Sequence, residues 1–268
     1  MTQGYLIYAQ GQKHRKYALH CAESIKNIDS SRPISFVTDK KYTNDLKIFD
    51  YIIEIEENTD KFHVLNRSKL FQYSPYDETT VVESDCIVNQ NLENWWTRNK
   101  DKDLSFVSQA YTYRQEKLDT TYDRKTFVEN DLPNLYVALH YFKKSDFTKK
   151  FFKLVELINT QEDLRKQLLP NRNPKIPSMD VAVSLSAKLL DCADKVSYVG
   201  SDPMFIHMKP YSQGWQNPFE QWTKRVNLFK GNEIFVGPFR QQGIFHYIED
   251  ILWFFMCILI TSHEIYFL

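Results

Sequence analysis

Short apolar runs alternate with longer amphipathic segments along the first half of the chain. The runs over 4–10 and 34–39 predict buried strands, and residues 51–57 alternate like a half-exposed edge strand. Apolar residues at helical spacing predict a helix over 16–28, between the first two strands. Strands that alternate with helices in this way are typical of a doubly wound α/β sheet, in which ligands bind at the carboxyl ends of the strands.

The second half continues this alternation, with longer polar segments between the elements. Its strands are predicted over 104–110, 134–143, 195–200 and 204–209, and its helices over 146–158 and 178–191. Ser178 is the expected N-cap of the last of these helices. The polar residues over 111–132 are expected to form a mobile or substrate-facing insertion, and 210–240 to be mostly loop.

Two acids interrupt an apolar strand pattern in "VVESDCIV", residues 81–88, which follows a predicted helix over 66–76. Residues two apart on a strand point to the same side, so Glu83 and Asp85 are expected to project together near the end of the strand. Oxygen ligands of this kind suit Mn²⁺ or Mg²⁺, hard cations that neutralise a diphosphate leaving group. The alternative is a solvated strand end in which Asp85 caps a turn.

Composition narrows the classes of partner. Lysine plus arginine equals aspartate plus glutamate at 34 each, so no global charge favours nucleic acid or an anionic membrane. The four cysteines lie far apart and form no CxxC pair, which predicts neither a disulfide framework nor a zinc site and favours a reducing, cytoplasmic compartment. Aromatic residues reach 15%, a content that suits a bulky core as well as a carbohydrate pocket.

The segment "ILWFFMCILI", residues 251–260, is apolar on every side. Its ten residues are about half the length that spans a bilayer. We expect a helix that is buried in the core or in a homodimer interface, and the alternative is peripheral contact with a membrane.

Four segments, in the correct order, resemble motifs of the GT-A nucleotide-sugar glycosyltransferases, and more narrowly those of glycosyltransferase family eight. Residues 67–88 are similar to that family's helix with a basic residue, followed by "LDADxIV", and 134–147 are similar to its "FNAGVLLxN" strand. Residues 178–185 resemble its "DQDALN" element, and 205–211 resemble its "HxxGxxKPW" signature. The resemblance covers roughly residues 4 to 211.

This resemblance implies a GT-A fold, in which helices flank a mixed, mostly parallel sheet. It divides the chain into a catalytic domain over 1–210, with a nucleotide-binding half over about 1–100 and an acceptor half over about 101–210, and a C-terminal loop and helical extension over 211–268. The implied activity is metal-dependent transfer of a sugar from a nucleoside-diphosphate sugar, a UDP-sugar, to an acceptor with retention of anomeric configuration. The implied cofactor is Mn²⁺ or Mg²⁺.

The resemblance also implies roles for named residues. The implied metal ligands are Glu83, Asp85 and His207, and the alternative for His207 is a core or hydrogen-bonding histidine. The implied contacts to the nucleotide and diphosphate are Gln10, Gly11, Tyr17, Asp39, Lys69 and Lys209, with His14 an alternative to Tyr17 and Arg67 an alternative to Lys69. Asn134 and Asp180 would contact hydroxyls of the donor sugar, and Asp180 is the first suspect for a base if the enzyme inverts configuration.

The chain also departs from the family's pattern. Glu83 replaces an aspartate, Tyr136 and Ala138 fill positions around the missing "FNAGV" glycine, and His207 and Lys209 are only two residues apart. These departures motivate a first alternative, a non-catalytic module that binds a sugar nucleotide or a glycan. A second is a nucleotidyltransferase, although "AQGQKHRK" holds only one glycine. The acceptor is left open among a glycan, a protein and a modified DNA base.

Overall fold

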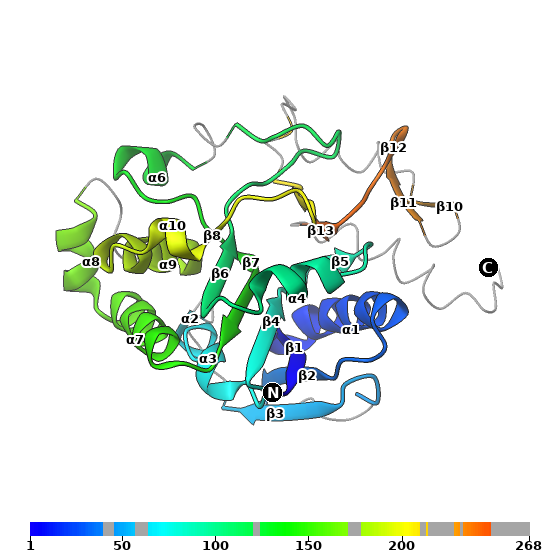
Figure 1. Cartoon of the computed structure of the whole chain (residues 1–268), viewed down its shortest axis with the longest axis horizontal. Helices are drawn as coiled ribbons and strands as arrows, with labels where there is room; N and C mark the ends of the chain where they lie inside the picture. The colour runs from blue at the N-terminus through cyan, green and yellow to red at the C-terminus, as the bar shows by residue number, and fades with distance from the viewer. Residues whose placement is uncertain are drawn as a thin grey trace.

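A seven-stranded sheet forms the centre of the molecule (Figure 1). The computed structural model describes residues 1–39, 46–56, 64–119, 124–170, 178–209, 213, 228–230 and 233–247. The strands of the sheet are β1 (Gln3–Tyr8), β2 (Ile34–Asp39), β3 (Tyr51–Ile55), β4 (Glu78–Val82), β6 (Leu104–Val107), β7 (Tyr136–Lys143) and β8 (Ser197–Tyr198). Their order is β3-β2-β1-β4-β7-β6-β8.

The first four strands of this order are parallel, β7 runs antiparallel to both of its neighbours, and β8 is parallel to β6. The sheet is therefore mixed and mostly parallel, which confirms the predicted α/β class. The strands predicted over 4–10 and 34–39 are confirmed to within a few residues and are buried on both faces, and β3 is the half-exposed edge strand predicted over 51–57.

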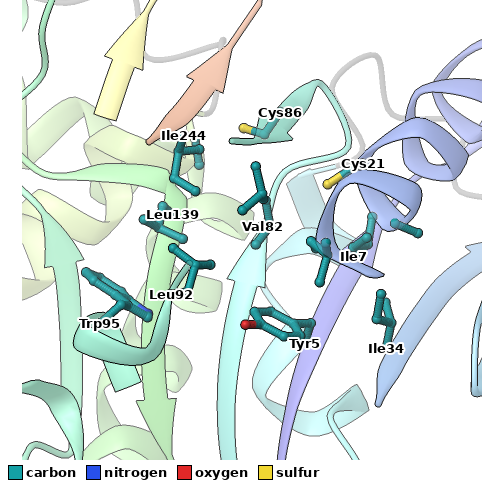
Figure 2. Close-up of a cluster of buried hydrophobic side chains, with 14 of the residues drawn as sticks. Tyr5, Ile7, Cys21, Ile34, Val82, Cys86, Leu92, Trp95, Leu139 and Ile244 are labelled. Carbon is teal, nitrogen blue, oxygen red and sulfur yellow. The ribbon is translucent and has the colours of Figure 1, made fainter. Parts of the chain in front are cut away.

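Helices cover both faces of the sheet. On one face, Tyr5 and Ile7 of β1 pack in a core with α1 (Gly11–Ile28) and α4 (Glu93–Asn99), and Figure 2 shows these residues together with Cys21 and Trp95. On the other face, Leu6 packs in a second core with α7 (Asp146–Thr160) and α9 (Met179–Leu189). Alternate residues of one strand thus enter opposite cores, as the period of a β-strand requires.

Several shorter elements differ from the sequence prediction. The helix predicted over 66–76 is two short helices, α2 (Val64–Arg67) and α3 (Leu70–Tyr73). Two helices, α4 and α8 (Glu162–Leu168), were not predicted from the sequence. The insertion over 111–132 contains one short helix in its described part, α6 (Lys125–Glu129). One more short helix, α10 (Ala193–Val196), precedes β8. The loop predicted over 210–240 instead contains an antiparallel sheet of β10 (Leu228–Lys230), β11 (Glu233–Val236) and β12 (Phe239–Arg240).

A third sheet, called the small sheet below, brings together three distant parts of the chain. It consists of β5 (Cys86–Val88), β13 (Ile244–His246) and β9 (Phe205–His207), with β13 in the middle. β13 is antiparallel to β5 and parallel to β9. The strand predicted over 81–88 is therefore two strands in two sheets, β4 and β5, and residues 83–85 form the turn between them.

Gly243 lets β13 lie beside β9. Its φ is +74°, and a Cβ at this position would lie 2.0 Å from the carbonyl oxygen of Met204. An L-residue is disfavoured in this left-handed conformation, and the steric conflict is with backbone, which cannot move aside cheaply. A glycine is thus required where the chain enters β13.

The apolar segment 251–260 lies outside the described residues, so its prediction stays open. Within the described part of the chain, no helix combines the length and the apolar character needed to cross a membrane.

Candidate functional site

A cavity of about 280 Å³ opens at the carboxyl ends of β1 and β4. This is the edge at which ligands bind in open α/β sheets. The wall comes from the ends of β1, β4 and β7 and from the helices beside them, and consists of Tyr8, Ala9, Gln10, His14, Arg67, Leu70, Val81, Val82, Glu83, Ser84, Asp85, Val137, His140 and Met179.

The two acids of "VVESDCIV" face this cavity from the turn after β4. The turn is fixed at both ends, because the Glu83 N–H donates to the carbonyl of Ala138 at 2.9 Å and the Asp85 carbonyl accepts from Tyr247 N–H at 3.0 Å. The Glu83 side chain is 23% exposed and that of Asp85 28%. The two acids therefore lie together because of the turn. They were predicted to do so as neighbours on one strand, and this was wrong, because residues 83–85 are not part of a strand.

His246 of β13 completes the acidic turn. Its Nε2 lies 3.3 Å from Asp85 Oδ1 and 3.5 Å from Glu83 Oε2. Burial alone would raise the pKa of Asp85, but the His246 charge and hydrogen bond, with a smaller effect of Arg67, hold it below its usual value. The imidazole of His246, which is not itself a wall residue, thus lies within 3.5 Å of both wall carboxylates.

The register of the small sheet places three side chains of metal-binding types in one row. His246 is the partner of Cys86 on β5 and of His207 on β9. Register partners share a face of a sheet, so these residues form a Cys–His–His row that continues the apolar row of Val88, Ile244 and Phe205.

The donor set fits a divalent cation. Asp85, Cys86 and His246 each offer one ligand atom within 4.8 Å of the other two. Burial, with a smaller contribution from Asp85, raises the pKa of the Cys86 thiol well above its usual value, so the thiol is protonated while no cation is bound. The carboxylate oxygens and the imidazole nitrogen of the site suit Mn²⁺.

His207, which the resemblance implies as a ligand, lies behind His246. The Nδ1 atoms of the two rings are 3.0 Å apart. Among the described residues, no ion pair joins His207 to either acid. His246 was not predicted from the sequence, because no element was expected over 241–250. The local signal there is an apolar pair before His246 with a glycine before that pair.

Arg67 is the basic residue of the cavity. It ends α2, lines the wall and forms an ion pair with Glu83 Oε1. Lys69 is half-buried at the N-cap of α3 and is not among the wall residues. Of the two basic residues that the sequence offered for the donor, the structure brings Arg67 to the acids.

The predicted nucleotide-binding residues after β1 and β2 contact one another. The Gly11 N–H donates to Asp39 Oδ2 at 2.7 Å, which ties the start of α1 to the end of β2. Gln10 Oε1 accepts from Asn66 Nδ2 at 3.1 Å and from the hydroxyl of Tyr8. Within the described structure, the buried atoms Gln10 Nε2 and Asp39 Oδ1 have no hydrogen-bond partner. Gln10 lines the cavity, so its Nε2 is a donor left for a polar ligand, whereas Asp39 lies outside the wall.

Tyr17 and His14, the two candidates for stacking on the base, differ in position. Tyr17 is 5% exposed and meets the ring of Tyr247 edge-on at 5.8 Å. His14 is exposed and lines the cavity, with its ring 5.8 Å from that of Tyr17. The structure thus brings His14 to the cavity and packs Tyr17 behind it.

Asp180 and Asn134 lie beside the cavity but not in its wall. Asp180 Oδ1 accepts from the Val137 N–H at 3.0 Å, and its Oδ2 accepts from Arg124 Nη2 at 3.0 Å. Asn134 Nδ2 donates to the carbonyl of Ser108 at 3.1 Å. Asp180 thus anchors β7 to the start of α9, and its neighbour Met179 reaches the cavity. Lys209 is half-buried just beyond β9 and is not a wall residue.

Solved structures with the same arrangement of elements are glycosyltransferases. The galactosyltransferase LgtC, in complex with donor and acceptor sugar analogues, aligns over 92% of this chain and 87% of its own with a TM-score of 0.57 and 12% identity. The apo form of the glycosyltransferase GlyE of Streptococcus pneumoniae TIGR4 aligns over 93% of this chain with a TM-score of 0.53 and 12% identity, and another crystal structure of GlyE does so at 13% identity. This chain spans about half of GlyE, 55% of its length.

Sequence comparison adds no closer relationship. Neither a protein-family model nor a curated protein sequence matches the chain. At this level of identity the likeness to solved structures concerns the fold. The mixed, mostly parallel central sheet with helices on both faces agrees with the architecture expected from the sequence motifs. The chain has the GT-A glycosyltransferase fold.

Proposed function

We propose that the protein is a metal-dependent glycosyltransferase that moves a sugar from a nucleoside-diphosphate sugar, a UDP-sugar, to an acceptor. The observation that carries the proposal is that two carboxylates of the cavity wall, Glu83 and Asp85, lie at the carboxyl end of β4 with the imidazole of His246 within 3.5 Å of both. A fold shared with glycosyltransferases, including one that binds donor and acceptor sugar analogues, supports it.

The residues in and beside the cavity would each have a task in this reaction. Asp85, Glu83 and His246 would hold Mn²⁺ or Mg²⁺, which as a Lewis acid stabilises a diphosphate leaving group. The Arg67 guanidinium would add a second positive charge on the diphosphate, because it leaves Glu83 when the cation arrives. Gln10 and Asp39 would bind the nucleoside through their unpartnered polar atoms, and His14 would contact the base.

We further propose retention of anomeric configuration. The carboxylates in the described cavity wall are Glu83 and Asp85, and both are needed at the cation. The described wall therefore offers no further carboxylate as nucleophile or base. In a front-face transfer, the bond from the anomeric carbon to the diphosphate oxygen breaks, the acceptor oxygen bonds to the same face, and its proton passes to the leaving phosphate.

The test is release of nucleoside diphosphate from a panel of nucleotide sugars with Mn²⁺ present. We expect Asp85→Asn to lower the rate by about two orders of magnitude or more, because the charge that holds the cation is worth several kcal/mol in the transition state. Asp163→Asn is the matched control, since the Asp163 side chain is 91% exposed on α8 and pairs only with Lys166 of its own helix among the described residues.

The other outcomes identify the alternatives. Binding of a nucleotide sugar without release under any condition would indicate a non-catalytic binding module. Release of pyrophosphate from a nucleoside triphosphate and a sugar phosphate would indicate a nucleotidyltransferase. Retention is checked separately, by NMR of the anomeric proton of the product.

A further inference from the structure

The two nitrogens of His246 face different partners. Nε2 faces the carboxylates of Asp85 and Glu83, and Nδ1 lies 3.0 Å from Nδ1 of His207. A contact between two imidazole nitrogens at this distance needs one hydrogen between them, so one ring donates and the other accepts. The identity of the donor ring decides whether Nε2 of His246 presents a hydrogen or a lone pair to the two acids.

A neutral imidazole carries its hydrogen on one nitrogen only. If His246 carries it on Nδ1 and donates it to His207, the lone pair of Nε2 points toward the acids and is available to a cation. If His207 is the donor, Nε2 of His246 carries the hydrogen and cannot bind a metal. His207 must therefore be the acceptor in any state in which His246 is a metal ligand.

The His207 ring is held in place as a fixed partner for His246. Phe205 stacks on it at 5.8 Å and Tyr136 meets it edge-on at 5.3 Å. Strand β9 is also held at this point, because the His207 N–H donates to the carbonyl oxygen of Tyr111 at 3.0 Å.

The same packing links the metal side to the predicted sugar side. The Arg124 guanidinium lies 4.1 Å above the ring of Tyr136 and forms an ion pair with Asp180 at 3.0 Å. Asp180 and Arg124 thereby hold Tyr136, and Tyr136 holds the ring of His207. Asp180 and His207, two residues that the sequence motifs indicate, are thus joined by one chain of contacts through Arg124 and Tyr136, which ends at His246.

We propose that His207 is a positioning residue whose Nδ1 accepts the Nδ1–H of His246 and so directs Nε2 of His246 to the metal. This inference rests on the proposed function, because it assumes a cation at Asp85, Glu83 and His246. It reassigns His207 from ligand to support, and it explains why the chain has two histidines in register on neighbouring strands.

The experiment measures Mn²⁺ binding by calorimetry, on the full chain, with and without UDP. His207→Phe keeps a packed ring but removes the acceptor, and we expect its affinity for Mn²⁺ to fall about tenfold or more, the usual effect of losing the partner of a metal-bound histidine. His207→Asn places an acceptor oxygen near the former Nδ1, and we expect it to recover most of that loss. His20→Phe is the control, since His20 is a buried histidine of α1 outside the cavity wall.

Two results would overturn the assignment of His207. One is a His207→Phe protein that binds Mn²⁺ within about twofold of wild type, and the other is a folded His207→Asn protein as weak as His207→Phe. If wild type itself binds no Mn²⁺ with or without UDP, the metal centre fails, and with it both the proposed function and this inference. Normal Mn²⁺ binding and turnover in His207→Phe would remove the inference alone.

A measurement on the unsubstituted protein keeps the inference testable if His207→Phe does not fold. With ¹⁵N-labelled histidine and diamagnetic Cd²⁺, we expect His246 to carry a hydrogen on Nδ1 and the metal on Nε2. Cadmium bound to Nδ1 of His246, or to His207, would overturn it.

Discussion

Arg67 pairs with one of the two acids of the turn, so we expect it to weaken binding of the cation and to strengthen binding of the donor. Its guanidinium pairs with Glu83, one of the two carboxylates that the cation needs. Arg67→Ala removes both a repelling charge and a competitor, so we expect Mn²⁺ alone to bind severalfold more tightly. The donor loses a charge-assisted contact worth about 1.5–3 kcal/mol, so we expect its KM to rise roughly 10- to 100-fold. Calorimetry with Mn²⁺ and initial-rate kinetics measure the two effects.

Arg67→Lys separates the charge from the fork-shaped geometry of arginine. A lysine keeps a positive charge but cannot form two parallel hydrogen bonds, so we expect it to keep the weaker Mn²⁺ binding of wild type and to recover part of the KM. Equal weakening of Mn²⁺ and donor binding in Arg67→Ala would contradict competition at Glu83 and would indicate that Arg67 only supports the turn.

At the scale of elements, the position of His246 depends on the entry of the chain into β13. Gly243→Ala forces a Cβ to within 2.0 Å of the Met204 carbonyl, in addition to the cost of a positive φ. We expect a loss of roughly 1–3 kcal/mol of stability and a clear loss of Mn²⁺ affinity, because β13 must move away from β9. Gly237→Ala is the matched control, since Gly237 has a φ of +58° but open space around its Cβ position. Equal effects of the two substitutions on Mn²⁺ affinity would contradict this account of β13.

The site divides into a part that the sequence could predict and a part that it could not. Glu83 and Asp85 stand out locally, because acids interrupt an apolar run, and Gln10 and Asp39 follow recognisable strands. His246 reaches the acids only through pairing of β13 with β5, about 160 residues earlier in the chain. Such a register depends on tertiary contacts and leaves no periodic signal in three residues. The short helix α4 was missed for a related reason: its tryptophans Trp95 and Trp96 are fixed by packing on the sheet rather than by helix propensity.

At the scale of the whole molecule, His140 couples the cavity to the stability of the fold. It is 3% exposed, its Nδ1 lies 2.7 Å from the Val137 carbonyl, and its ring stacks on Phe106 at 5.0 Å in the interior of the sheet. Burial, the largest cause, lowers the pKa of His140 to about 4. The folded state therefore holds this ring neutral, with the hydrogen on Nδ1 toward Val137, over a pH range in which the unfolded chain is protonated.

The sign of the resulting pH dependence follows from proton uptake. Between the unfolded value near 6.5 and the folded value of about 4, the unfolded state binds more protons, so the free energy of unfolding falls as the pH is lowered through this window. The contribution of His140 to the free energy of unfolding is present in full above the unfolded pKa. It falls by about 1.4 kcal/mol per pH unit below that value, roughly 3 kcal/mol in all.

His140→Phe keeps a stacked ring that cannot be protonated. We therefore expect the free energy of unfolding of this variant to depend less on pH over this window, with a slope smaller by the equivalent of about one proton. His207, whose pKa is also lowered by burial, leaves a remaining slope. Urea unfolding at half-unit steps from pH 4.5 to 7 measures both slopes, and parallel profiles for the variant and the wild type would show that His140 is already charged in the folded protein.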